Sequence, residues 1–368
     1  MSRCLLDYLD WTEPEPELAR IVRLTAQLAD EDGSADDGPE WPKGLWSLLE
    51  RDGATRWSLP QEFGGEACPR PLLVERYARL AGGSLTAVFI LSQHDAAVRR
   101  LMAAPANTTA ARWLHAIGAG RAFTTVGISH LTTSRRLGPR AIKVAELARG
   151  GYQLDGTIPW VTAAVRADLF VTGAALDDGR QMLVALPTDR RGVVVSPPFP
   201  LAALQASCTS QVLLDAVQVD DSDLLAGPAL DIMSQPGAVG TAGLETSALA
   251  LGQARAALAA LVEMAPERGE LAEPLEVLCE NWKLLWGQLM AQARGEADAV
   301  SPTEIRTQAN ALVLRSTQAY LTARKGTGFL RTEPAQRWAR QALFFLVWSC
   351  PAPVAQAAIR SLAGLCQA

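Results

Sequence analysis

Histidine is scarce in this chain of 368 residues, and its cysteines lack the spacing of a metal site. There are three histidines and six cysteines, and no two cysteines form a CxxC pair. Neither a structural zinc site nor a disulfide framework is indicated, so we expect no bound metal. Reduced, partly buried thiols in so long a chain predict a cytoplasmic protein.

The chain also lacks an excess of charge and a long apolar run. Its formal net charge is -5 and its basic residues are scattered, which argues against nucleic-acid binding. The first ten residues, MSRCLLDYLD, include acids and no apolar centre, so we expect no export signal. No run looks long enough to span a membrane. What the chain does have is 49% apolar residues, enough for a large core in two or three domains.

The periodicity of apolar residues changes twice along the chain. Residues 1–118 follow a helical period, whereas residues 119–228 hold short β-rich runs separated by Gly-containing turn signals. Residues 229–368 are rich in Ala and Leu and return to long helical segments with short connections. We therefore predict an α+β multidomain protein with an N-terminal helical domain (1–118), a middle antiparallel β-barrel domain (119–228) and a C-terminal helical bundle (229–368).

An indole and a hydroxyl stand two residues apart in the most distinctive stretch, residues 151–172. Asp155-Gly156 within it signals a turn between two strands. On a strand, Trp160 and Thr162 would lie on one face and present a flat aromatic surface and a hydrogen-bond donor to one object. A planar cofactor suits such a face. From the spacing alone, a core tryptophan beside a surface threonine is the alternative.

Three segments, in the right order and spacing, resemble the acyl-CoA dehydrogenase family. They are residues 151–172 with their Gly-Tyr, Trp-x-Thr and Ala-Asp elements, residues 59–65 (LPQEFGG) and residues 324–340 (RKGTGFLRTEPAQRWAR). The resemblance implies the domain order given above, FAD as the cofactor and an acyl-CoA or acyl-carrier thioester as the substrate. It also implies an electron acceptor such as an electron-transfer flavoprotein, and a homodimer or homotetramer.

The same resemblance assigns cofactor contacts. Trp160 and Thr162 would lie along the flavin, with the threonine hydroxyl near N5. Residues 123–133 take the place of the family's flavin-binding loop, and residues near 268 and 326 match segments that reach the flavin across the subunit interface. The candidate cofactor-binding residues are Phe123, Thr125, Thr132, Trp160, Thr162, Arg268, Gly326 and Gly328.

The family's usual catalytic base is missing. In most members it is a Glu nine residues after the conserved Arg, and from Arg340 that count reaches Ser349. A minority carries the Glu on an earlier helix, seven residues before a Gly, and Glu245 precedes Gly252 by seven. The resemblance thus implies Glu245 as the base. Its helix face, shared with Leu249, predicts partial burial and a raised pKa. The alternative is an idle first-turn carboxylate favoured by the helix dipole.

Three functions stay open. The first is flavin-dependent α,β-dehydrogenation of an acyl thioester, in which Glu245 removes the α-proton and FAD N5 accepts a hydride from the β-carbon. The second is a flavin-dependent monooxygenase on the same fold, with His130 and Ser349 in the substrate pocket. The third is a degenerate, non-catalytic member that binds an acyl thioester or a protein partner. The Trp-x-Thr pair argues against the third, because a chain that has lost flavin has no evident reason to keep it.

Overall fold

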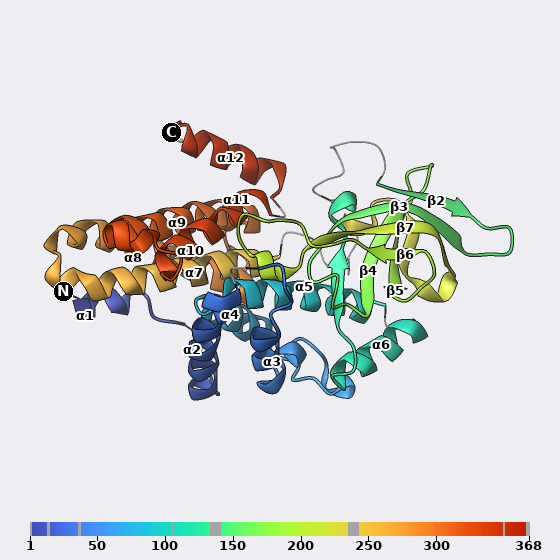
Figure 1. Ribbon diagram of the computed structural model, residues 1–368, viewed down its shortest axis with the longest axis horizontal. Helices are drawn as coiled ribbons and strands as arrows, with labels where there is room; N and C mark the ends of the chain where they lie inside the picture. Colours follow the sequence, from blue (N-terminus) through green and yellow to red (C-terminus); the bar gives the residue numbers. More distant parts are fainter. Residues whose placement is uncertain are drawn as a thin grey trace.

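The computed structural model describes residues 2–12, 15–35, 38–104, 106–132, 141–234, 243–348 and 350–365. Helices come first and last along the chain and strands lie between them, so the predicted order of helix, strand and helix is confirmed. The strands gather at one end of the molecule and the helices stack at the other (Figure 1). The residue boundaries of the three domains stay a prediction.

The first part of the described chain forms helices, of which α5 matters most for the site. The helices are α1 (Ser2–Asp7), α2 (Leu18–Ala35), α3 (Lys43–Arg51), α4 (Arg70–Ala81), α5 (Leu85–Met102) and α6 (Thr108–Gly118). The Ser84 side chain caps α5 by accepting a hydrogen bond of 3.1 Å from the Ala87 amide. Helix α5 is apolar on most sides because it packs against α4, α6, α7 and strand β1 (Thr124–Gly127). It therefore runs through the centre of the fold.

The strands form two four-stranded sheets, with the orders β1-β4-β5-β8 and β2-β3-β7-β6. All pairs are antiparallel except β1 with β4. After β1 come β2 (Ile142–Glu146), β3 (Tyr152–Val161), β4 (Leu169–Ala175), β5 (Gln181–Pro187), β6 (Val193–Val195), β7 (Ser210–Val219) and β8 (Leu224–Ala229). Residues of α5 and α6 share an apolar core with the first sheet, so the sheets stand directly against the helices.

The Asp155-Gly156 pair does not form a turn, and the prediction of one there is wrong. Strand β3 continues through it, with a shift in register against β7 between Leu154 and Gly156. Gly156 has a φ of 139° and lies so close to the Ala141 carbonyl that a Cβ would overlap it. The glycine is needed for a β-bulge and not for a chain reversal.

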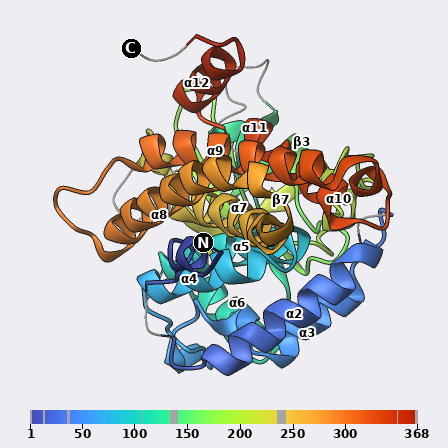
Figure 2. The same ribbon diagram turned by 90° about the vertical axis from the view of Figure 1, so that its left-hand side faces the viewer.

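The last part of the chain forms a helical bundle around α7 (Figure 2). Its helices are α7 (Leu244–Met264), α8 (Ala272–Arg294), α9 (Pro302–Arg324), α10 (Pro334–Ala342), α11 (Phe344–Val347) and α12 (Ala352–Leu362). The sequence predicts one helix over residues 334–349, but the chain breaks at Leu343, between α10 and α11. After the break, Phe344 of α11 packs against Phe89 of α5.

Helix α7 is apolar on all sides because neighbours surround it. In the described part of the chain, Leu244–Glu267 is long and apolar enough to cross a membrane by length and composition, and 67% of its apolar window is buried in the fold. The expectation that no run reaches this length is therefore wrong. Helices α4, α8 and α9 pack against α7, which accounts for its composition as a core helix.

The contact between α7 and α4 depends on Gly252. A Cβ at this position would overlap the carbonyl oxygen and carbon of Ala78. We expect Gly252→Ala to lower the free energy of unfolding by about 1–3 kcal/mol because the helices must move apart. Gly287, in the middle of α8, has open space around it. Gly287→Ala is the matched control and should stabilise by about 0.5–1 kcal/mol. Denaturant unfolding measures both, and equal effects would contradict the packing argument.

Candidate active site

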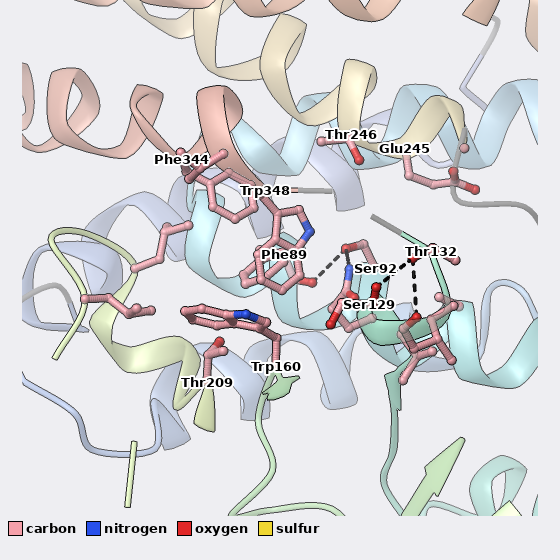
Figure 3. A pocket seen from close by; sticks show the side chains of 18 of the residues that line it. Phe89, Ser92, Ser129, Thr132, Trp160, Thr209, Glu245, Thr246, Phe344 and Trp348 are labelled. Atoms are coloured by element: carbon pink, nitrogen blue, oxygen red, sulfur yellow. Dashed lines mark hydrogen bonds between the residues drawn. The ribbon is translucent and has the colours of Figure 1, made fainter. Parts of the chain in front are cut away.

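A cavity of 590 Å³ lies where the sheets meet the helices (Figure 3). One wall comes from α5, and another from the end of β1 and the turn that follows it. A third wall comes from the end of β3 and the segment before β7, and the last from the first turn of α7 together with α10 and α11. Side chains from all three parts of the chain therefore line one cavity.

Of the Trp160 and Thr162 pair, only Trp160 lines the cavity. Trp160 is 41% exposed, and its ring lies 4.8 Å from that of Phe199, centroid to centroid. Thr162 follows the end of β3 and is only 1% exposed. Its hydroxyl accepts a hydrogen bond of 3.3 Å from Thr209, which does line the cavity. The pairing of β3 with β7 shifts register between Ile158 and Val161, a span that includes Trp160. The simple alternation that would put both on one face therefore does not apply here.

The predicted flavin loop divides into a part at the cavity and a part behind it. Thr132 lines the cavity and donates a hydrogen bond of 3.3 Å to the Ile128 carbonyl. Phe123 and Thr125 are buried in the interior and do not line it. Ser129, which the sequence did not single out, lines the cavity, and its buried hydroxyl has no hydrogen-bond partner in the described part of the chain.

Of the two residues predicted for a monooxygenase pocket, the structure describes His130 alone. His130 does not line the cavity, and its Nε2 lies 2.7 Å from the Gly173 carbonyl oxygen. Burial lowers the pKa of His130 although this hydrogen bond acts to raise it. Ser349 lies outside the described residues. The neighbouring Trp348 does line the cavity.

Three of the predicted cofactor residues lie together but away from the cavity. Arg268 donates a hydrogen bond of 2.6 Å from Nη1 to the Ala323 carbonyl at the end of α9. Gly326 and Gly328 follow in the 3-10 turn Lys325–Phe329. None of the three lines the cavity. Their assignment rests on contacts across a subunit interface and stays a prediction.

Glu245 lies in the first turn of α7 and lines the cavity. Its Oε1 is 3.2 Å from Nη2 of Arg99 on α5, and its side chain is 18% exposed. Burial acts to raise the pKa of Glu245, but the charges of Arg99, Arg70 and Arg100, with a backbone hydrogen bond, outweigh it and hold the pKa below its usual value. The predicted rise is wrong. The cations come from α4 and α5, which the face of α7 alone does not reveal.

An aromatic cluster forms the wall across from Trp160 (Figure 3). The rings of Phe344 and Trp348 stack with centroids 5.4 Å apart and planes at 21°. Phe89 of α5 packs edge-on against Phe344 at 4.8 Å and against Trp348 at 4.6 Å. This wall was not predicted, although the spacing of Phe344 and Trp348 by four residues after the Arg340 motif was a signal for it.

The cavity suits a planar ring with a polar edge. Trp160 offers a partly exposed indole face, and the unpartnered Ser129 hydroxyl lies on the same cavity beside Thr132. A buried hydroxyl without a partner costs free energy until a ligand atom satisfies it. The volume lies in the range of small-molecule and cofactor sites. The residues present therefore fit a flavin ring, and the aromatic wall adds apolar surface to the same cavity.

Comparison with curated proteins finds dehydrogenases that act on coenzyme A esters. No protein-family model matches the chain. A protein named probable acyl-CoA dehydrogenase YngJ from Bacillus subtilis (strain 168) is 25% identical over 254 residues, which are 65% of this chain and 64% of the relative. Benzylmalonyl-CoA dehydrogenase from Aromatoleum aromaticum is 33% identical over 128 residues, or 34% of each chain. The matches thus span less than two thirds of either relative.

Solved structures share the fold over nearly the whole chain. Butyryl-CoA dehydrogenase from Megasphaera elsdenii has a TM-score of 0.77 at 16% identity and covers 96% of this chain and 100% of its own. A glutaryl-CoA dehydrogenase from Mycobacterium smegmatis, in complex with FADH2, has a TM-score of 0.77 at 19% identity, covering 97% and 96%. A nitrososynthase from Micromonospora carbonacea has a TM-score of 0.71 at 19% identity, covering 98% and 96%. At these identities the likeness establishes the fold.

Proposed function

Because the chain belongs to the acyl-CoA dehydrogenase family, we propose that it is an FAD-dependent oxidoreductase that introduces an α,β double bond into an acyl thioester. One observation carries the proposal: the cavity that Trp160 lines is also lined by Glu245, a carboxylate at the position of the relocated base. Aromatic surface, hydroxyl groups and carboxylate then act on one bound substrate.

Flavin, when bound, supplies the acceptor for the hydride that leaves the β-carbon. Trp160 would hold the ring by its indole face, and the hydroxyls of Ser129 and Thr132 would supply polar contacts to it. Glu245 takes the proton from the carbon next to the thioester carbonyl. It is ready to do so at neutral pH because the arginine charges keep its pKa below the usual value. The aromatic cluster of Phe89, Phe344 and Trp348 packs on the acyl chain and excludes water.

A monooxygenase is the second candidate, and one observation favours it. The ion pair of Glu245 with Arg99 at 3.2 Å stabilises the carboxylate and makes it a weaker base than a raised pKa would. A flavin enzyme that reacts with oxygen has no need of an α-proton base. A non-catalytic role is less supported, because the cavity keeps both an exposed indole and an unpartnered hydroxyl.

The mass of the product separates these candidates. Purified protein is loaded with FAD and given a set of acyl-CoA esters with an artificial electron acceptor, and the esters are then weighed by mass spectrometry. We expect a product that has lost two hydrogen atoms. A product that has gained an oxygen atom, formed only with oxygen and a flavin reductant, would replace the dehydrogenase by the monooxygenase. Protein that binds acyl-CoA but converts none of the esters would support the non-catalytic role.

We also propose a substrate class, an electron acceptor and an oligomeric state. The substrate is an acyl-CoA or acyl-carrier thioester, the electron acceptor is a protein such as an electron-transfer flavoprotein, and the working form is a homodimer or homotetramer. Large apolar side chains exposed on the bundle support a subunit interface there. They are Val277, Leu284, Phe329, Leu330, Ile359 and Leu362.

A further inference from the structure

Two fully buried polar side chains, Tyr77 on α4 and Asp95 on α5, hydrogen-bond to each other. Asp95 of α5 is 0% exposed, and its Oδ1 accepts a hydrogen bond of 2.7 Å from the Ser58 hydroxyl. Its Oδ2 accepts a short hydrogen bond from the hydroxyl of Tyr77 on α4, which is also 0% exposed. Buried polar groups of this kind are costly unless they are satisfied. The proposed chemistry makes no direct use of either one.

Arg99 lies one helical turn after Asp95 on α5 and lines the cavity. Burial acts to lower the pKa of Arg99, but Glu245, Tyr77 and Asp95 together raise it above its usual value. The guanidinium therefore stays charged. Its Nε and Nη1 atoms are buried without a hydrogen-bond partner in the described part of the chain, and Nη2 reaches Oε1 of Glu245 at 3.2 Å. Arg99 thus contacts the Glu245 carboxylate directly, whereas Asp95 lies one helical turn before it on α5.

The ion pair with Arg99 can assist Glu245 as a base in two ways, by orienting the carboxylate and by keeping it ionised. A base must point at the carbon whose proton it removes, and small misplacements are expensive in rate. It must also stay ionised after the substrate has displaced water from the cavity, a change that raises the pKa of a carboxylate. The charged groups that act on Glu245 are Arg70 on α4 and Arg99 and Arg100 on α5. Only Arg99 forms an ion pair with Glu245 in the described part of the chain.

We propose that Arg99 is a positioning residue for the Glu245 carboxylate, and that Asp95, held by Tyr77 and one helical turn before Arg99 on α5, assists it from the protein interior. The catalytic part of this inference rests on the proposed function, because it takes Glu245 to be the base. The electrostatic part does not, since the pairing of Glu245 with Arg99 exists without flavin or substrate. The two parts are therefore tested separately.

The electrostatic part is tested by an infrared titration of the carboxyl group in protein without flavin or substrate. The Glu245 band is assigned by its absence in Glu245→Gln. We expect Arg99→Gln to move the titration midpoint to higher pH, because the cation that lowers the pKa is gone. Arg99→Lys keeps the charge and should restore most of the difference. A midpoint that Arg99→Gln leaves in place would overturn the proposal, and the Lys variant guards against a general loss of structure.

The interior part is tested with Tyr77→Phe, which removes one hydroxyl and keeps the ring. We expect its infrared midpoint to rise, in the same direction as in Arg99→Gln, and kcat at pH 7 to fall on the order of tenfold with little change in KM. Tyr320→Phe is the matched control, since Tyr320 is buried in α9 and does not line the cavity. If Tyr77→Phe has the same infrared midpoint and the same kcat as Tyr320→Phe, Tyr77 and Asp95 contribute to packing alone.

Failure of the proposed function looks different from failure of this inference. If Glu245→Gln still exchanges the α-proton of an acyl-CoA with deuterium from solvent, Glu245 is not the base and the proposed mechanism falls. The catalytic part of the inference falls with it. If Glu245→Gln stops the exchange while Arg99→Gln leaves both the infrared midpoint and the exchange rate unchanged, the mechanism stands and Arg99 has no positioning role.

Discussion

Glu245→Gln is expected to slow α,β-dehydrogenation by about 100- to 10,000-fold, the range that a positioned general base contributes. The amide has the size of the carboxylate but cannot accept the α-proton. Flavin binding should persist, because Glu245 lies on the wall formed by α7 and Trp160 on another. The measurement is a single-turnover reduction of the bound flavin by acyl-CoA without oxygen, followed by stopped-flow absorbance.

Glu304 provides the matched control for this variant. Like Glu245, it is an acidic residue in the first turn of a long helix, but it lies on α9 and does not line the cavity. If Glu245 only interacts with the helix dipole, Glu245→Gln and Glu304→Gln should each lower the free energy of unfolding by about 0.3–1 kcal/mol. Neither variant should then change the rate of flavin reduction. Equal turnover in the two variants would remove Glu245 from the mechanism.

Trp160→Ala is expected to weaken FAD binding by about 10- to 100-fold. The indole is 41% exposed at the cavity, and a ring stacked on it would bury most of that surface. Covering an aromatic side chain of this size is worth about 1.5–3 kcal/mol, and each 1.4 kcal/mol is tenfold in affinity. Titration of the apoprotein with FAD, followed by quenching of flavin fluorescence, gives the dissociation constants.

Trp160→Phe separates the aromatic face from the fold around it. Phenylalanine keeps a flat ring at the end of β3, so we expect this variant to retain most of the affinity that Trp160→Ala loses. Unfolding midpoints of the two apoproteins show whether the strand is intact. Full FAD affinity in Trp160→Ala would mean that the ring binds elsewhere in the cavity or outside it.

The sequence predicts the helices well where local signals are strong. The helical period over residues 85–102 matches α5 (Leu85–Met102), because Ser84 supplies a cap that local sequence reveals. Local sequence signals give a wrong prediction where tertiary contacts override them. Asp155-Gly156 has turn chemistry, but the pairing of β3 with β2 and β7 turns it into a bulge. The break at Leu343 has no glycine or proline to mark it.

The sequence predicts which residues line the site better than it predicts the pKa of the carboxylate there. The family resemblance pointed to both Glu245 and Trp160, and both line the cavity. The direction of the Glu245 pKa could not be foreseen, because Arg99 lies far away in sequence and meets α7 only when α5 packs against it. The same holds for Thr162, which a register shift near the end of β3 places behind Thr209.

The most direct test of the central claim is the visible spectrum of FAD-loaded protein, recorded before and after acyl-CoA is added in the absence of oxygen. The account predicts that the oxidised flavin band bleaches with at least one acyl-CoA, and that it bleaches far more slowly in Glu245→Gln. A band that stays oxidised with esters of every chain length, in protein that binds them, would contradict the account.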